Sequence, residues 1–506
     1  MSTSPAAARP ALARWAKRLS PAHVMGFVVL ASILTKNLSA RLGDPDLWWH
    51  LRTGRLIVED GFPRTDVYSF TAYGDRWVTQ EWGPEVLFHA LRETFGLYGI
   101  VWYRALVLFA VYAVVARLVV RRMGHGLGTW ALITLTAYAG TTNWTERPNL
   151  LSYLLFVITL AILQRKSARV WWIVPLTAVW ANLHGMVLLG IGLVALTAAT
   201  EGLKSALRWD GADGAHARRL GLVTGAAVLA TFANPSGPGL IAHGFGLIQT
   251  VVGLVTEWAS PNFHALGTQA FLLLILITVA ALVMSPERPD PLDLAYALAF
   301  IVLGLQAVRN LALASIVLGF VCAGYLPGAL SSIPRRARAA RRQEVGDAGS
   351  VALGVAGLAV AIVGLAIPVA LWYPRSSAIG DVVEDTYPVA AIDALDRPGT
   401  CLFVADFWSG MVIDRTWPNV HLYMDLRQDV YGRARAQRYL RTLGGYPEWR
   451  ENLDDAGVTH ALVKPTHPLA QLLEQDGGWR LTRQDELSVT YERRDPSIRC
   501  SVPPRG

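Results

Sequence analysis

Apolar runs long enough to cross a membrane recur along the first three quarters of the chain. They lie near residues 21–41, 98–120, 128–143, 149–164, 170–184, 186–203, 219–234, 266–284, 290–308, 311–330 and 350–373. A helix needs roughly 17–25 predominantly apolar residues to span hydrocarbon. The pattern therefore predicts a mainly α-helical, polytopic membrane protein with about 11 transmembrane helices.

The composition supports this interpretation. Hydrophobic residues make up 53% of the 506 residues and charged residues only 17%, whereas soluble proteins carry about 25% charged residues. The net charge of +8 comes from cations in short loops between the runs, which the positive-inside rule explains better than nucleic-acid binding. No small-residue cleavage site follows the first run, so we expect it to remain as a membrane span.

Alternate loops differ in character, and the difference predicts the topology. One set is basic and includes 121–122, 165–169, 208–219 and 335–342, while the other set is poor in lysine. We expect the protein to lie in the inner or plasma membrane of the cell. If the basic tail 1–20 and the basic loops face the cytoplasm, residues 375–506 lie outside. Residues 239–257 are then an interfacial or re-entrant segment, because a further span there would turn the loop 335–342 outward.

Polar motifs gather on the outer side. The first outer loop, 42–97, opens with Asp44-Pro45-Asp46-Leu47-Trp48-Trp49-His50, which predicts an interfacial helix begun by an aspartate and a proline. A second helix is expected to begin in Gln80–Glu85. Further outer polar segments are Asn143–Asn149, Trp180–Gly185, Asn234-Pro235, Glu257-Trp258 and Arg309-Asn310. Polar groups from at least five hairpins thus meet one membrane face.

In the last 130 or so residues, short predicted strands alternate with predicted helices. This alternation predicts a soluble α/β domain over 375–506. Expected helices are 387–395, 431–443, 449–456 and 468–474, and expected strands are 401–404, 421–424, 460–463 and 488–493. No glycine-rich phosphate motif opens a helix, so a nucleotide site is unsupported. Cys401 and Cys500 could pair in an oxidising compartment, whereas Cys322 falls in a span. The absence of a CxxC motif argues against a zinc site.

An acidic pair in the first outer loop, leading an interfacial helix, resembles the GT-C class of membrane glycosyltransferases. That class includes protein mannosyltransferases, oligosaccharyltransferases and aminoarabinose transferases. The strings that carry the resemblance are Asp46–Leu51, Arg147-Pro148-Asn149, Asn182–Gly185 and Glu257-Trp258. The resemblance implies a transmembrane GT-C-like domain over 21–374, a polyprenyl-phosphate-linked sugar as donor, and transfer on the non-cytoplasmic side. No WWD-type acceptor signature is present, so a protein, a glycan and a lipid all stay open as acceptors.

The resemblance also implies that a first-loop aspartate acts as base or metal ligand, which we carry onto Asp44 and Asp46. A partly desolvated Asp46 could remove the proton from an acceptor hydroxyl. With Asp44 it could instead hold a divalent cation such as Mg²⁺ or Mn²⁺. His50 follows Asp46 at i+4 and can face the same site. The simpler alternative is that Asp44 caps the helix and Asp46 favours its dipole.

Other outer residues suit substrate binding. Arg147 and Arg309 could hold a lipid phosphate bidentately, although snorkelling to head groups would also place arginines there. Glu81 could supply another carboxylate, and Asn182 and His184 could contact substrate or bond between helices. Two further residues favour structural roles: Glu257 as an interfacial anchor and Arg427 in an ion pair.

Two classes of function follow. The first is an enzyme that transfers a sugar from a polyprenyl-phosphate-linked donor. The second is a flippase or assembly subunit of an envelope polysaccharide pathway, built on the same scaffold without catalysis. A transporter favours internal repeats and charges near the bilayer midplane. We find no repeat, and the charges lie near the outer rim, so the enzyme is the preferred hypothesis.

Overall fold

The computed structural model describes residues 20–39, 41–251, 253, 255–332, 383–498 and 500. The expected eleventh span at 350–373, the basic loop 335–342 and the basic tail up to residue 19 lie outside the described residues. The statements below concern the described part of the chain.

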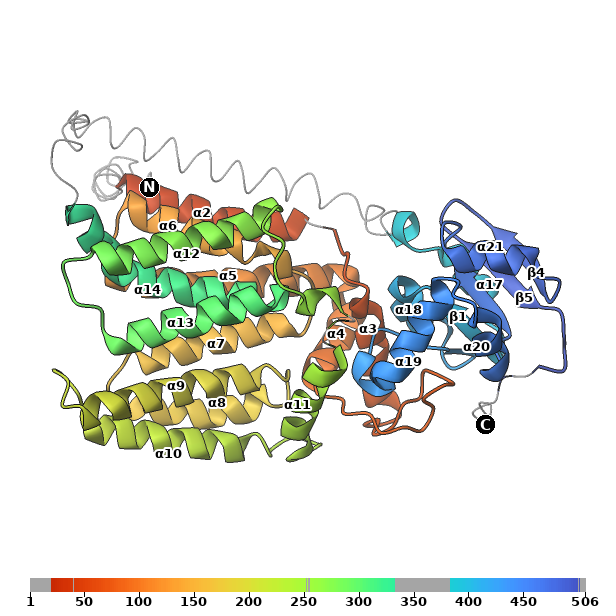
Figure 1. Ribbon diagram of the computed structural model, residues 1–506, viewed down its shortest axis with the longest axis horizontal. Helices are drawn as coiled ribbons and strands as arrows, with labels where there is room; N and C mark the ends of the chain where they lie inside the picture. Colours follow the sequence, from red (N-terminus) through yellow and green to blue (C-terminus); the bar gives the residue numbers. More distant parts are fainter. Residues whose placement is uncertain are drawn as a thin grey trace, which may run out of the picture.

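Helices dominate the first two thirds of the chain and run side by side in one bundle (Figure 1). Five helical segments are long and apolar enough to cross a membrane: Pro21–Ser39, Leu97–Met123, Val187–Ala206, Leu266–Met284 and Val308–Ser332. They are, or include, α2, α5, α9, α12 and α14 (Leu311–Ser332). The shorter members are α6 (Leu127–Ala139), α7 (Asn149–Leu163), α8 (Ile173–Trp180), α10 (Gly214–Ala230) and α13 (Pro291–Gln306).

One predicted span is divided in the structure. Residues 170–184 form the end of a 3₁₀ helix, Ala168–Trp172, followed by the eight residues of α8. Pro175 has no backbone N–H and cannot donate to the carbonyl four residues earlier, so a regular α-helix cannot run through the junction. The other predicted spans between 21 and 330 each contain one α-helix, with ends shifted by up to five residues.

The bundle packs through small residues inside and presents large apolar residues outside. A Cβ added at Gly319 of α14 would lie 2.2 Å from Oγ1 of Thr136 on α6, so these two helices require glycine for their close approach. On the outer surface Val283, Leu298 and Leu229 are exposed. Exposed aliphatic side chains on a helical bundle suit contact with lipid.

Three helices lie across one end of the bundle, namely α3 (Asp46–Glu59), α4 (Trp82–Phe95) and α11 (Gly239–Val251) (Figure 1). The first two are the helices predicted in the first outer loop. They pack closely, since a Cβ at Gly54 would lie 1.9 Å from the carbonyl oxygen of Glu85. Helix α3 buries Leu47, Trp48 and Leu51, whereas Val58 in its last turn is exposed.

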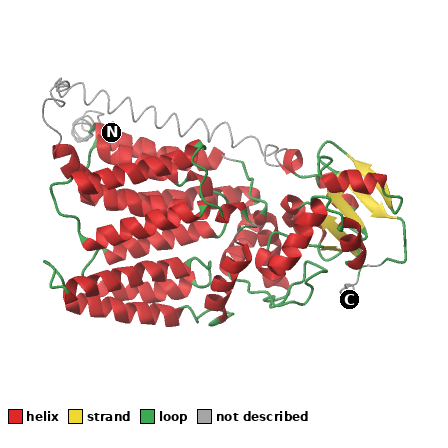
Figure 2. Ribbon diagram, in the orientation of Figure 1, coloured by secondary structure: helices red, strands yellow, loops and turns green. Residues whose placement is uncertain are grey.

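Residues 400–493 contain a five-stranded sheet beyond that end (Figure 2). Its order is β2 (Val420–Leu422), β1 (Thr400–Val404), β3 (His460–Val463), β5 (Val489–Arg493) and β4 (Trp479–Gln484). Strand β1 pairs parallel with β2 and β3, and the pairs β3–β5 and β5–β4 are antiparallel. The helices are α17 (Val389–Ala394), α18 (Asp406–Thr416), α19 (Gln428–Leu443), α20 (Trp449–Asp455) and α21 (Pro468–Gln475).

The pattern alone missed α18 and β4 in this region. Helix α18 has a glycine and mixed polar residues inside its sequence, and five of the six residues of β4 are exposed, so neither has a clear apolar period. A disulfide joins Cys401 on β1 to Cys500, which resolves the pairing that the sequence left open. Cys322 is a buried free thiol.

The first outer loop docks on this sheet. Ser69 forms a parallel bridge with Leu422 of β2, the N–H of Leu422 donates to the carbonyl of Tyr68 at 3.0 Å, and the N–H of Phe70 donates to the carbonyl of Leu422 at 2.9 Å. Helix α18 also packs on the start of α3, where a Cβ at Gly410 would lie 2.4 Å from the carbonyl oxygen of Pro45. The sheet region and the acidic motif are therefore parts of one packed unit.

Candidate active site

A cavity of about 650 Å³ lies where α3, α4, the ends of the bundle helices and the start of α19 meet. Such a volume is within the usual range of small-molecule sites. Six of the eight predicted site residues line it: Asp46, His50, Glu81, Arg147, His184 and Arg309. The structure thus brings together side chains from the first outer loop and from three later hairpins, as the polar motifs predict.

Arg147 pairs with both aspartates of the acidic motif and with a third carboxylate. Its guanidinium pairs with Asp44, reaches Asp46 at 3.1 Å, and reaches Glu257 at 2.8 Å. The Nε–H donates to Asp44, which is buried behind Arg147 and does not line the cavity. One cation is therefore already shared by three carboxylates. Glu257, expected as an interfacial anchor, also lines the cavity.

Asp46 has three neighbours and an altered pKa. Besides Arg147, its Oδ1 accepts from Trp49 Nε1 at 3.1 Å, and its backbone N–H donates to Asp44 Oδ1 at 3.0 Å. Burial raises the pKa of Asp46 to about 6, although the charge of Arg147 opposes that rise. Because a general base works best with a pKa near the ambient pH, this value suits the role proposed from the sequence. The Asp44 carboxylate also accepts from the N–H of Asp46, the first residue of α3, although the N-cap residue is Pro45 and the helix has no side-chain cap bond.

A second layer holds the acidic motif in place. Glu146 accepts from the backbone N–H of Gly43 at 2.6 Å and of Asp44 at 3.0 Å. The same carboxylate pairs with Arg104 of α5 at 2.6 Å, with both side chains almost fully buried. The sequence reasoning missed this pair, although an arginine inside the apolar run 98–120 was a signal, because charges within spans face partners in the protein interior.

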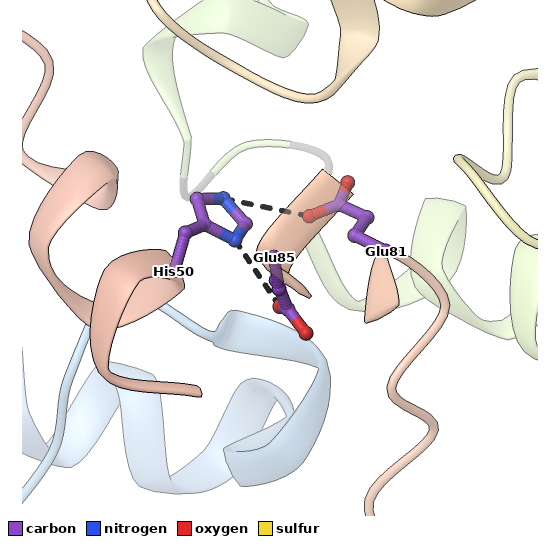
Figure 3. Close-up of side chains that lie close together, drawn as sticks. All are labelled: His50, Glu81 and Glu85. Carbon is purple, nitrogen blue, oxygen red and sulfur yellow. Dashed lines mark hydrogen bonds and ion pairs between the residues drawn. The ribbon is translucent and has the colours of Figure 1, made fainter. Parts of the chain in front are cut away.

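Alternating carboxylates and imidazoles form a chain through the cavity (Figure 3). His50 lies between two glutamates: its Nδ1 is 3.2 Å from Glu85 Oε1 and its Nε2 is 3.5 Å from Glu81 Oε2. Glu81 continues to His184 Nε2 at 3.0 Å, and the N–H of Met186 donates to His184 Nδ1 at 3.0 Å. Each group is thus oriented by its neighbour, and His184 does contact a cavity carboxylate rather than only another helix.

The chain separates the pKa values of its members. Burial acts to raise the pKa of Glu81, but the nearby His184 and His50 outweigh it and lower the pKa to about 2. Burial raises the pKa of Glu85 to about 7, against the opposing bond to His50. For His50, burial acts to lower the pKa, and the bond to Glu85 with the charge of Glu81 outweighs it, so the pKa rises. Divergent pKa values among close groups are typical of sites that move protons.

Arg309 and Asn182, both predicted to bind substrate, differ in their surroundings. Arg309 lines the cavity with its guanidinium 4.3 Å from the Trp258 ring, and within the described residues no carboxylate lies within ion-pair distance of it. Asn182 does not line the cavity. It accepts from Trp82 Nε1 at 3.0 Å and donates to the carbonyl of Ala233 at 2.7 Å, so it positions α4 rather than facing a ligand.

Two places could hold a divalent cation, and they differ in fit. The predicted pair, Asp44 and Asp46, already has its oxygens occupied by Arg147 and by N–H donors, so a metal there requires Arg147 to move. One ligand atom each from His50, Glu81 and Glu85 lies within 4.8 Å of the others, close enough for one ion. That second set is the better fit to a metal among the described residues.

The sheet region also reaches the cavity. Leu426, Arg427 and Asp429 line it. Arg427 is buried and pairs with Asp66 of the first outer loop at 2.5 Å and with Asp425 at 2.6 Å, which agrees with the structural ion pair expected from the sequence. Asp66 was not a candidate, because it lies 361 positions from Arg427 and such a separation carries no local signal of contact.

Comparisons with known proteins identify the fold. No protein-family model matches the chain, and no curated protein matches it. The archaeal oligosaccharyltransferase AglB from Archaeoglobus fulgidus, in complex with an inhibitory peptide and a dolichol-phosphate, is 13% identical with a TM-score of 0.53, over 87% of this chain and 69% of that chain. ArnT from Cupriavidus metallidurans in the apo state is 14% identical with a TM-score of 0.52, over 95% of this chain and 98% of that chain. The fold is that of the GT-C class of membrane glycosyltransferases, which confirms the resemblance found in the sequence.

Proposed function

We propose that the protein transfers a sugar from a polyprenyl-phosphate-linked donor to an acceptor, with the cavity as its active site. One observation carries the proposal: Asp46, the candidate base, and Arg309, a cation that pairs with no carboxylate of the described residues, line the same cavity of a GT-C fold. The AglB structure of that fold holds a dolichol-phosphate, and this supports a polyprenyl phosphate as the carrier here.

In the proposed reaction Asp46 takes the proton from the acceptor hydroxyl as its oxygen attacks the anomeric carbon. The bond between that carbon and the phosphate oxygen breaks, and the electron pair leaves with the polyprenyl phosphate. Direct displacement inverts the anomeric centre. The shared partner Arg147 keeps the Asp46 carboxylate oriented, and burial keeps its pKa near 6, so the base is ionised at neutral pH.

Arg309 is the proposed phosphate ligand. A guanidinium binds a phosphate bidentately. The Arg309 guanidinium lies 4.3 Å from the Trp258 ring, and among the described residues no carboxylate pairs with it. Arg147 is less available because three carboxylates share it. Leu188 of α9 and Leu247 of α11 line the same cavity and provide an apolar side for the first isoprene units of the lipid.

A divalent cation, Mg²⁺ or Mn²⁺, is part of the proposal. His50, Glu81 and Glu85 would hold it, or Asp44 with Asp46 if Arg147 moves aside. The ion would neutralise charge on the leaving phosphate. Glu81 and His184 otherwise orient each other at the cavity wall.

The proposed arrangement in the membrane follows the sequence. Residues 1–20 form a cytoplasmic tail, 21–374 the transmembrane domain with about 11 spans and the outer loop 42–97, and 375–506 an extracytoplasmic α/β domain. Asp393 belongs to the proposed extracytoplasmic domain and Asp210 to a proposed cytoplasmic loop, and both side chains are exposed on the protein surface. A membrane-impermeant thiol reagent applied to intact cells should therefore label Asp393→Cys and not Asp210→Cys. The native cysteines do not interfere, because two are disulfide-bonded and Cys322 is buried. The reverse labelling would contradict the topology.

The function is tested by turnover. The purified full-length protein is incubated with a panel of polyprenyl-phosphate sugars and candidate acceptors, and released polyprenyl phosphate is measured for the wild type and for Asp46→Asn. Release by the wild type alone would support a transferase with its base in the first outer loop. Binding without release from any donor would favour the transport or assembly alternative.

A further inference from the structure

Two buried polar atoms of opposite character lack partners at the same cavity. Among the described residues, Oε2 of Glu85 and Nη1 of Arg427 are inaccessible and accept or donate no hydrogen bond. Their side chains are 1% and 2% exposed, and both residues line the cavity. Leaving such atoms unsatisfied costs roughly 1–3 kcal/mol each, so their joint presence calls for a partner that supplies both a donor and an acceptor.

The charge balance limits what that partner is. The guanidinium of Arg427 already faces two carboxylates, from Asp66 and Asp425, and Tyr431 donates to Asp425 at 2.7 Å. An arginine compensated in this way does not favour an anion, and a nearby carboxylate would repel one. A neutral hydroxyl accepts from an N–H and donates to a carboxylate at the same time.

The walls around these atoms are aromatic. The Arg427 guanidinium carbon lies 4.4 Å from the Trp77 ring, and Trp49 and Trp77 approach each other edge-to-face at 6.5 Å. Both tryptophans line the cavity. Apolar walls with a few placed polar groups are typical of small-molecule sites, and a sugar ring offers an apolar face together with hydroxyls.

We propose that Glu85 and Arg427 form a subsite that binds a hydroxyl of the donor sugar, accepting from it at Glu85 Oε2 and donating to it from Arg427 Nη1. The inference rests on the proposed function and deepens it. It assigns sugar recognition to a joint site of α4 and the sheet region, on other residues than the proposed phosphate ligand Arg309 and base Asp46.

The test compares two lipids rather than one. Affinities of the full-length protein for bare polyprenyl phosphate and for polyprenyl phosphate carrying a hexose or a pentose are measured by tryptophan fluorescence. The detergent has no sugar head group, EDTA is present, and the pH is above the pKa of Glu85. The ratio of the two affinities reports the sugar alone, because any general loss of folded protein cancels.

We expect the wild type to prefer at least one glycosylated lipid, and Glu85→Gln to lose about tenfold of that preference. Each variant is compared with its own affinity for bare lipid, because Glu85 also belongs to the proposed metal site. Arg427→Lys should lower the same ratio. The matched control is Glu93→Gln on the exposed side of α4, which should leave the ratio unchanged.

Three results would overturn the inference. The ratio of Glu85→Gln could equal that of the wild type, which would leave an ordered water or the acceptor as the partner of the two atoms. The wild type could bind bare and glycosylated lipids equally for every sugar. The preference could appear only when EDTA is omitted, which would assign it to a metal ion. A wild type that binds neither lipid would instead contradict the proposed function itself.

Discussion

The two ends of the helical bundle both bury charge, but they use it differently. At the end away from the sheet region, Arg122 of α5 reaches Asp293 of α13 at 3.0 Å, and Tyr325 of α14 donates to the other oxygen at 2.9 Å. The Arg122 guanidinium also lies 3.7 Å from the Phe320 ring. At the cavity end, carboxylates outnumber arginines around Asp46, and Glu85 keeps an oxygen that no described residue contacts through a hydrogen bond.

The difference separates structural from functional charge. Each oxygen of Asp293 has a donor within the bundle, and no member of that group lines the cavity. Paired charges of this kind lock helices to one another. The groups around Asp46 face an open volume with unequal charge and divergent pKa values, and such sites are where ligands and protons bind. Burial alone therefore does not distinguish the two ends.

The largest change in turnover number or stability is expected when one carboxylate at each end of the bundle is replaced by the corresponding amide. Asp46→Asn should lower the turnover number by about 10²–10⁴-fold, the usual contribution of a general base, with little change in thermal stability. Asp293→Asn should lower thermal stability and leave the turnover number of the folded protein unchanged. Turnover and thermal unfolding of both variants are measured side by side.

The opposite pattern would remove the distinction. If Asp293→Asn abolished turnover in a protein of normal stability, the far end would be functional. If Asp46→Asn turned over normally, Asp46 would be a structural partner of Arg147 only.

The docking of the first outer loop on the sheet region should depend on the buried pair of Asp66 and Arg427. Removing one partner of a buried pair costs roughly 3–5 kcal/mol, so Asp66→Asn should lower the unfolding temperature clearly. The matched control is Asp393→Asn, which breaks the exposed pair with Arg415 and should have little effect, because surface pairs contribute about 0–1 kcal/mol. Equal shifts in the two variants would show that the buried pair does not hold the interface.

An arginine stacked on a tryptophan occurs at each end and allows a matched comparison. Arg309 lies 4.3 Å from the Trp258 ring at the cavity, and the exposed Arg288 lies 4.3 Å from the Trp209 ring at the far end. Arg309→Gln should weaken polyprenyl-phosphate binding about tenfold, as expected for loss of a charge-assisted contact. Arg288→Gln should bind as the wild type does. Equal affinities in both variants would transfer the phosphate role to Arg147.

Much of this site was predictable because its members follow local rules. The acidic motif, Arg147 and Arg309 stand at or near the ends of apolar runs, and His50 and Glu81 lie in the loop that joins two of these runs. Topology alone places such segments on one face. The helices of the first outer loop were predictable from their apolar spacing and their start signals.

The unpredicted parts depend on contacts between distant segments. Glu146 and Asp66 act through partners that are 42 or more positions away in the sequence, and no local pattern encodes such a contact. Asn182 belongs to a motif-like segment, but its side chain faces the start of α4, where Trp82 Nε1 donates a hydrogen bond to its side-chain oxygen. Sequence spacing located the face of the site, and packing decided which side chains line it.

The smallest expected effect concerns the pH profile, and it identifies the titrating group. If Asp46 is the base, the turnover number should rise with pH through about 6, since burial raises the pKa of Asp46 to about 6 and the base must be ionised to act. Glu81, with its pKa lowered to about 2, is ionised throughout and adds no inflection, whereas Glu85 would give one near 7. The bond from Trp49 Nε1 to Asp46 at 3.1 Å favours the ionised carboxylate. Trp49→Phe should therefore move the acid limb to higher pH by less than about one unit, and the exposed Trp102→Phe should not move it. An acid limb that stays in place in Trp49→Phe would assign the titration to Glu85 and leave Asp46 without the role of base.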